Sequence, residues 1–108
     1  MDTSVISSEL ELANLLAQQE FFAEHGEPMY CGFAWVDVPV TRTNSKEAKM
    51  LMELGFKKSW QPKTMQFWIG QKVGNHGQSM DIKIAGAQAM VEVLEKYGIK
   101  ASYRCRAD

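Results

Sequence analysis

Aromatic and basic residues stand at alternating positions in stretches that we expect to be strands, a spacing from which a sheet could bind nucleic acid. Every second side chain of a strand shares one face, and aromatic rings beside arginines can stack on bases and contact phosphates. The predicted sheet-face site consists of Tyr30, Gln66, Trp68, Lys100, Arg104 and Arg106. The stretch KTMQFWIG lacks the signature of RNA-recognition domains, so single-stranded nucleic-acid binding is an alternative and not the leading prediction.

A glycine-rich segment before a predicted helix is the second candidate site. Backbone N–H groups at a helix N-terminus favour anions, and glycines let the backbone approach a ligand. The candidate anion loop consists of Lys72, Gly74, Asn75, His76, Gly77 and Ser79. An anion- or cofactor-binding enzyme that uses the loop from Gly70 to Ser79 is a third hypothesis, and an ordinary flexible connection is the alternative explanation of the same residues.

The sequence predicts no catalytic dyad and no metal site. His25 and His76 lie in predicted loops without a neighbour for a metal pair or a nucleophile–base pair. Cys31 and Cys105 lack the paired spacing of zinc ligands. We therefore expect no catalytic residues, no metal ligands and no cofactor, and the sequence leans against an enzyme without excluding one.

Length and composition indicate one globular domain, residues 1–108, with 45% apolar and 23% charged residues. The net charge of −1 hides an asymmetry: three bases and nine acids precede Gly55, and nine bases and four acids follow Leu54. This asymmetry makes the molecule dipolar if the halves occupy different faces, whereas interleaved elements would mix the charges. The acidic N-terminus does not resemble a signal peptide and no apolar run could span a membrane, so we expect a cytoplasmic protein.

The stretch MYCGFAWVDVPV, from Met29 to Val40, is the predicted central strand, because aromatic and β-branched residues crowd it between Pro28 and Pro39. A helix is predicted from Ser8, which would form a capping box with Glu11, to Glu24. The other predicted elements are a helix capped by Asn44 or Ser45 and closed by Gly55, a hairpin turning at Gln61–Lys63, a helix from Ser79 to Tyr97, and a last strand over 99–106.

These elements predict an α+β fold. Residues 29–107 form the ferredoxin-like βαββαβ arrangement, a four-stranded antiparallel sheet in the order 4-1-3-2, and residues 1–26 add an N-terminal helix. Small residues on the last helix, Ala85, Gly86 and Ala89, call for large partners beneath them. The predicted core is Cys31, Phe33, Trp35, Met65, Phe67, Ile69, Ile99, Ala101 and Tyr103, which leaves Tyr30, Gly32, Ala34 and Val36 on the open face.

Two further contacts are predicted. The N-terminal helix should pack, through Leu12, Leu15, Leu16 and Phe22, against the domain or a second copy, and it could cover the open face. Cys31 and Cys105 should be reduced thiols that face each other across the first and last strands.

The stretch CGFAWVDV, with Ala85, Gly86 and Ala87 before Val93, Leu94, Gly98 and Ile99, resembles small uncharacterised proteins of tailed bacteriophages and prophages. The resemblance implies an accessory factor in the host cytoplasm that binds a host or phage protein. The leading prediction is therefore a small non-enzymatic interaction module, with a protein partner, self-association or both.

Overall fold

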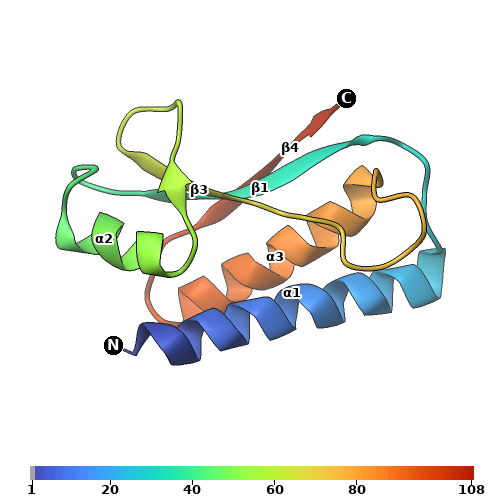
Figure 1. The fold of residues 1–108 in the computed structure, drawn as a ribbon, viewed down its shortest axis with the longest axis horizontal. Coiled ribbons are helices and arrows are strands. Elements are labelled where there is room, and N and C mark those ends of the chain that lie inside the picture. Colours follow the sequence, from blue (N-terminus) through green and yellow to red (C-terminus); the bar gives the residue numbers. More distant parts are fainter. Residues whose placement is uncertain (1) are drawn as a thin grey trace.

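The computed structural model describes residues 2–108, which form three helices on one side of a four-stranded sheet (Figure 1). The elements are α1 (Thr3–His25), β1 (Gly32–Pro39), α2 (Lys46–Glu53), β2 (Lys57–Lys58), β3 (Thr64–Trp68), α3 (Met80–Lys96) and β4 (Ser102–Ala107). The strands pair antiparallel in the order β2-β3-β1-β4. The α+β class, the ferredoxin-like strand order and the additional N-terminal helix are confirmed.

Short polar side chains set where the helices begin. The Ser45 hydroxyl accepts a hydrogen bond from the Ala48 N–H at 3.2 Å, and Ser79 is the N-cap of α3, as predicted. The predicted start of the first helix at Ser8 is wrong. Asp2 is its N-cap and accepts from the Ser4 N–H at 3.0 Å, so helical structure already includes Thr3 and the Ser8 hydroxyl lies mid-helix.

The helices bury one face of the sheet. Helix α1 runs antiparallel to α3 beside it, and both lie beneath the sheet in Figure 1. Ile6 and Leu10 of α1 join a core to which β1 contributes every second residue, with Ala34 and Val36 fully buried. Ala48 and Leu51 bring α2 into the same core. The other face of the sheet is left without a helix from residues 2–108.

The predicted orientation of β1 is wrong. Gly32, Ala34 and Val36 face the helices, and Phe33 and Trp35 lie on the opposite face. The small residues of α3 do not make room for Phe33 and Trp35, because α1 fills the space beside Gly86. A Cβ on Gly86 would lie 2.0 Å from Oδ1 of Asn14, so α1 approaches α3 where a side chain is missing.

The N-terminal helix does not pack against the domain through the predicted stripe, and packing of that stripe against a second copy stays a prediction. Its buried residues recur every fourth position, which follows one side of a helix. They are Ile6, Leu10, Asn14 and Gln18. Leu12 and Leu16 are 55% and 53% exposed, so the two leucines point away from the domain. The prediction considered apolar residues only, whereas two of the four buried positions of α1 are polar, Asn14 and Gln18.

Cys31 and Cys105 are free thiols, but they do not face each other. Cys105 is opposite Ala34, and the Cys31 carbonyl accepts from the Asp108 N–H at 3.0 Å, so the register differs by three residues from the predicted pairing. Three residues correspond to roughly 10 Å along a strand. Cys105 is paired with Ala34 and so shares its helix-facing side, whereas Cys31, three residues before Ala34, falls on the opposite side of the alternation.

Candidate functional site

The candidate site is the sheet face that the helices leave open. Residues paired across antiparallel strands point to the same side, so the register fixes which side chains adjoin. Three rows cross the face: Lys57–Gln66–Asp37–Ser102, Trp68–Trp35–Arg104, and Phe33–Arg106. The face therefore combines aromatic rings at its centre with two arginines along β4.

The aromatic residues form a packed cluster. The rings of Trp35 and Trp68 stack with centroids 4.5 Å apart and an interplanar angle of 25°. Phe33 meets Trp68 edge-on at 6.0 Å. Trp35 is 6% exposed and Trp68 is 42% exposed, so Trp35 supports the ring that Trp68 presents to solvent. Such a ring is already fixed by packing and loses little freedom when a flat ligand stacks on it.

Arginines border the cluster. The Arg106 guanidinium lies 5.8 Å from the centroid of Phe33, and the Arg104 side chain is 51% exposed. Nη1 of Arg104 lies 4.0 Å from Oδ2 of Asp37, at the limit of an ion pair. Both guanidinium groups thus keep donors free for an anionic ligand.

A cavity of about 500 Å³ lies over this cluster. It is lined by Trp35, Trp60, Trp68, Arg104, Cys105 and Arg106. Trp60 belongs to the turn between β2 and β3 and is 77% exposed. Its ring is therefore available as a second wall that can close on a ligand held by the sheet.

A second cavity of about 380 Å³ continues along the same face past Asp37 toward Lys100 and Ser102. Asp37 is 6% exposed, and its Oδ1 has no hydrogen-bond partner among residues 2–108, nor has Nε1 of Trp35. Burial raises the pKa of Asp37, although the charge of Arg104 and the Trp35 indole act in the opposite direction. The face therefore contains one acidic group among its basic ones.

The structure brings together most of the predicted sheet-face site. Gln66, Trp68, Arg104 and Arg106 lie on the open face, and Lys100 precedes β4 at the rim of the second cavity. Tyr30 lies elsewhere. It precedes β1, is 60% exposed, and its carbonyl accepts from the Met80 N–H at 3.0 Å at the start of α3.

Sequence reasoning missed Phe33, Trp35, Asp37 and Trp60. The signal was present in the alternation of the central strand. The alternate positions that include Ala34 and Val36 contain no charged residue, whereas the other set contains Asp37. A charged residue seldom faces a core, so Asp37 indicated that Phe33 and Trp35 point outward. Trp60 had no such signal, because turn residues carry no periodicity.

The predicted anion loop holds an anion of its own chain. The carboxylate of Glu27 accepts from the backbone N–H groups of Asn75 at 2.8 Å, His76 at 3.0 Å and Gly77 at 3.2 Å. The Gln71 side-chain amide donates to the same carboxylate at 2.6 Å. These bonds, the Asn75 N–H first, lower the pKa of Glu27 from its ordinary value of 4.5 to about 2.

Two further backbone donors of the loop are also engaged. The Ser79 N–H donates to Oε1 of Gln71 at 2.8 Å, and the Lys72 N–H donates to Oε1 of Gln18 at 2.7 Å. Gly74 has φ 85°, and a Cβ there would lie 2.7 Å from the carboxyl carbon of Glu27. The glycines thus admit the Glu27 carboxylate, which takes the position that an external anion would need.

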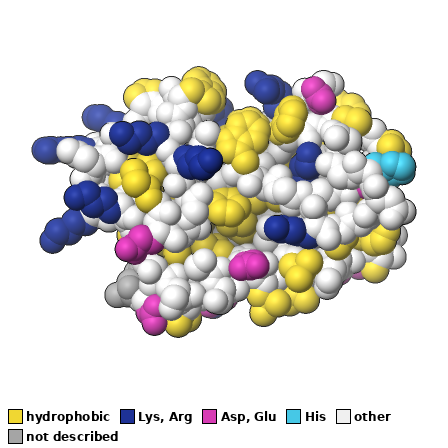
Figure 2. Space-filling model, viewed as in Figure 1, with side chains coloured by type: hydrophobic (Ala, Val, Ile, Leu, Met, Phe, Trp, Pro, Cys, Tyr) yellow, Lys and Arg dark blue, Asp and Glu magenta, His cyan; other side chains and the backbone are white. Residues whose placement is uncertain are grey.

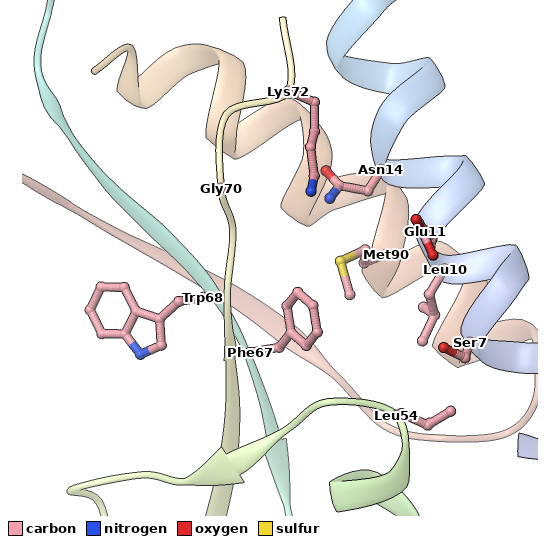
Figure 3. Close-up of a pocket in the computed structure, with 10 residues that line it drawn as sticks. All are labelled: Ser7, Leu10, Glu11, Asn14, Leu54, Phe67, Trp68, Gly70, Lys72 and Met90. Atoms are coloured by element: carbon pink, nitrogen blue, oxygen red, sulfur yellow. The ribbon is translucent and has the colours of Figure 1, made fainter. Parts of the chain in front are cut away.

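A smaller cavity of about 270 Å³ lies between α1 and the helix side of β3 (Figure 3). Leu10, Phe67 and Met90 form its apolar wall, and Lys72 and Glu11 lie at its edge. Figure 3 shows Phe67 and Trp68 on opposite sides of β3, as strand alternation requires. The cavity is therefore separated from the open face by the sheet.

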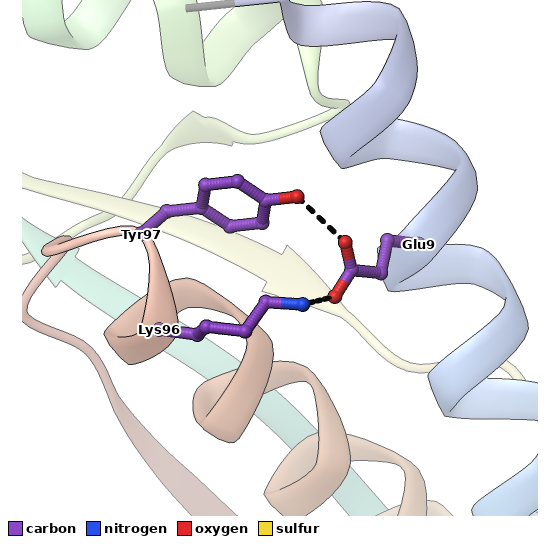
Figure 4. Close-up of polar contacts among 3 residues, drawn as sticks. All are labelled: Glu9, Lys96 and Tyr97. Atoms are coloured by element: carbon purple, nitrogen blue, oxygen red, sulfur yellow. Dashed lines mark hydrogen bonds and ion pairs between the residues drawn. The ribbon is translucent and has the colours of Figure 1, made fainter.

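Contacts at the far end of α3 hold α1 on the helix side. The Tyr97 hydroxyl donates to Oε1 of Glu9 at 2.6 Å, and Lys96 pairs with the same carboxylate (Figure 4). Together with the close approach at Gly86, these contacts fix both halves of α1 against α3. The open face is for this reason not covered by the N-terminal helix.

Within residues 2–108, no three His, Cys, Asp or Glu side chains lie close enough to hold a metal ion. The same residues include no helix with the length and apolar character needed to cross a membrane.

Comparisons with known proteins gave no relative of this chain. A scan against protein-family models matched no family, and searches of curated proteins and of solved structures also gave no match. The resemblance to bacteriophage proteins stays a prediction.

Proposed function

We propose that this chain is a binding module that holds single-stranded nucleic acid on the open face of its sheet. One observation carries the proposal: Trp68 stacks on Trp35, and Arg104 and Arg106 lie beyond Trp35 on β4, on a face without a covering helix from residues 2–108. Exposed aromatic rings bind bases by stacking, and guanidinium groups bind phosphates. A single strand is favoured over a duplex because the faces of unpaired bases can reach the rings.

The shape of the site supports an extended ligand. The two cavities follow one another across the face, from the tryptophans to Lys100 near the start of β4. A strand that stacks one base on Trp68, with Trp60 on its other side, can direct its backbone along Arg104 toward Lys100. Asp37 opposes phosphate binding at the centre, so the phosphates would follow β4 and avoid β1.

Protein binding, the first prediction from the sequence, stays a prediction; on this face we favour nucleic acid because exposed rings stand beside basic side chains. In the anion loop, the N–H groups of Asn75, His76 and Gly77 donate to Glu27, so they are not available to an external anion.

The test is equilibrium binding of fluorescein-labelled 12-mers of mixed sequence, single-stranded and duplex, at several salt concentrations. We expect the single strand to bind more tightly, and Trp68→Ala to weaken its binding roughly 5- to 150-fold, the range for loss of one stacked base. Arg104→Ala should weaken binding and reduce the slope of log K against log salt by about 0.7.

Tyr30→Ala is the matched control, because it removes an exposed aromatic ring outside the cluster. It should leave the affinity unchanged. Salt-independent binding, absence of binding, or equal losses for Trp68→Ala and Tyr30→Ala would overturn the proposal.

A further inference from the structure

Asp37 places a carboxylate with unused acceptor capacity on the open face. Its side chain lines the second cavity, the one of about 380 Å³, yet the residue is 6% exposed and Oδ1 has no hydrogen-bond partner among residues 2–108. Nη1 of Arg104 lies 4.0 Å from Oδ2, which is too far for a hydrogen bond. A buried polar group without partners is rare in folded proteins, so Asp37 calls for a ligand that donates hydrogen bonds.

The second cavity lies one step along the sheet from the tryptophan stack. Trp35 and Asp37 are two positions apart on the open face of β1, a separation of roughly 7 Å. An extended single strand advances further per nucleotide than the roughly 3.4 Å of a duplex strand. The base next to the one stacked on Trp68 therefore reaches the second cavity, whose volume is within the range of small-molecule sites, about 300–1,000 Å³.

Guanine is the base that matches an acceptor-only group. Its Watson–Crick edge presents two adjacent donors, N1–H and the 2-amino group, which one carboxylate can accept together. Adenine and cytosine place a ring acceptor beside their single amino group, and thymine places its N–H between two carbonyl oxygens, so each of them turns an acceptor toward Asp37. Lys100 and Arg104 line the same cavity and can donate to O6 and N7 of guanine.

We propose that Asp37 makes the open face selective for guanine, by accepting the N1–H and 2-amino donors of the base that follows the one stacked on Trp68. This inference rests on the proposed function, because it assigns the base held in the second cavity of the same site. It also gives a role to an acid among basic groups: Asp37 repels phosphates and selects a base.

The probes are four fluorescein-labelled single-stranded 12-mers in which thymine alternates with guanine, adenine, cytosine or hypoxanthine. Fluorescence anisotropy in lithium chloride, which suppresses guanine quadruplexes, gives their affinities for the full chain. The guanine repeat should bind roughly 5- to 150-fold more tightly than the adenine and cytosine repeats, the range for one bidentate base contact. Hypoxanthine lacks only the 2-amino group of guanine, so its repeat should bind at least about fivefold more weakly than the guanine repeat.

Asp37→Asn tests the carboxylate itself. A carboxamide has one acceptor side and one donor side, which match the amino group and the N1 acceptor of adenine, so the preference should shift from guanine toward adenine. A variant that fails to fold loses all four repeats alike, and the comparison of guanine with hypoxanthine on the unaltered chain then decides. Glu53→Gln is the matched control, because it removes one acidic charge from the exposed side of α2, and it should leave the ratio of guanine to adenine affinity unchanged.

The outcomes separate this inference from the proposed function. Equal affinity for the four repeats would overturn guanine selection and leave nucleic-acid binding standing, whereas absence of binding to all four would overturn both. A guanine preference that folded Asp37→Asn leaves unchanged would also overturn the inference, because another residue would then read the base.

Discussion

Glu27 shows how one residue can occupy a site that the sequence offers to a ligand. Glycines and free N–H groups before α3 indicated anion binding, and the structure places a carboxylate from a distant segment there. The loop is thereby tied to the segment between α1 and β1. The sequence indicated that this loop binds an anion, but it did not indicate that the anion is the Glu27 carboxylate.

The lowered pKa of Glu27 predicts how stability changes with pH. A carboxyl that titrates near 4.5 in the unfolded chain and near 2 in the folded chain stabilises the fold above pH 4.5. This contribution declines as the pH falls from 4.5 to about 2. Glu27→Gln should therefore lower the free energy of unfolding at pH 7, and the difference from the wild type should disappear toward pH 2.

Chemical unfolding at a series of pH values measures this difference. Glu24→Gln, which changes an exposed glutamate at the next-to-last position of α1, is the control. Wild-type and Glu27→Gln curves that stay parallel from pH 7 to pH 2 would show that the loop does not hold the ionised carboxylate.

At the scale of the elements, the contact between α1 and α3 decides the architecture. It depends on Gly86, which lies against the amide side chains of Asn14 and Gln18. Gln18 donates to Oδ1 of Asn14 at 2.7 Å and to the Gly70 carbonyl at 3.0 Å, so the buried amides also anchor the chain beyond β3. A helix pair is thus joined by polar groups at the position where the sequence suggested packing onto aromatic rings.

Gly86→Ala should destabilise the protein by about 1–3 kcal/mol, although alanine is the better helix former, because the new methyl group enters an occupied and hydrogen-bonded space. Asn14→Ala removes the nearest atom, so the double variant should lose less stability than the two single changes together. Urea unfolding of the four proteins measures the coupling. A stabilising Gly86→Ala, or strict additivity, would contradict the packing described here.

At the scale of the whole molecule, basic side chains gather at one end although the two halves of the sequence interleave in the fold. The acidic helix α1 occupies one side, and exposed bases gather at the end that contains α2 and the β2–β3 turn, as Figure 2 shows when compared with Figure 1. These bases are Arg42, Lys46, Lys49, Lys57, Lys58 and Lys63. These bases come from both halves of the chain, which interleave in the fold, and the field of this basic end can steer an anionic ligand toward the sheet.

Replacing Lys57, Lys58 and Lys63 by Gln should slow the association of a single-stranded oligonucleotide several-fold at low salt, with little change in dissociation, because these bases attract the ligand before contact. Stopped-flow fluorescence at 20 mM and 1 M salt measures both rates. The effect should vanish at about 1 M salt, where the Debye length is roughly 3 Å. An effect confined to the dissociation rate would show direct contact instead of steering.

The sequence by itself determined the element order, the strand order and two of the helix caps. These features follow from local signals: turn residues, capping serines, and apolar periods that each act over a few neighbours. It also placed Gln66, Trp68, Arg104 and Arg106 on the open face, because β3 and β4 alternate cleanly.

The tertiary structure decided which face of β1 is buried, where α1 lies and which anion fills the glycine loop. Each of these depends on a contact between segments far apart in the chain: Asn14 with Gly86, Glu9 with Tyr97, and Glu27 with Asn75. The central strand has apolar residues on both faces, so apolar periodicity alone could not choose between them, and Asp37 was the one residue of β1 that indicated the exposed face. The position of α1 made the choice, because it filled the space beside α3 and left Trp35 to the open face.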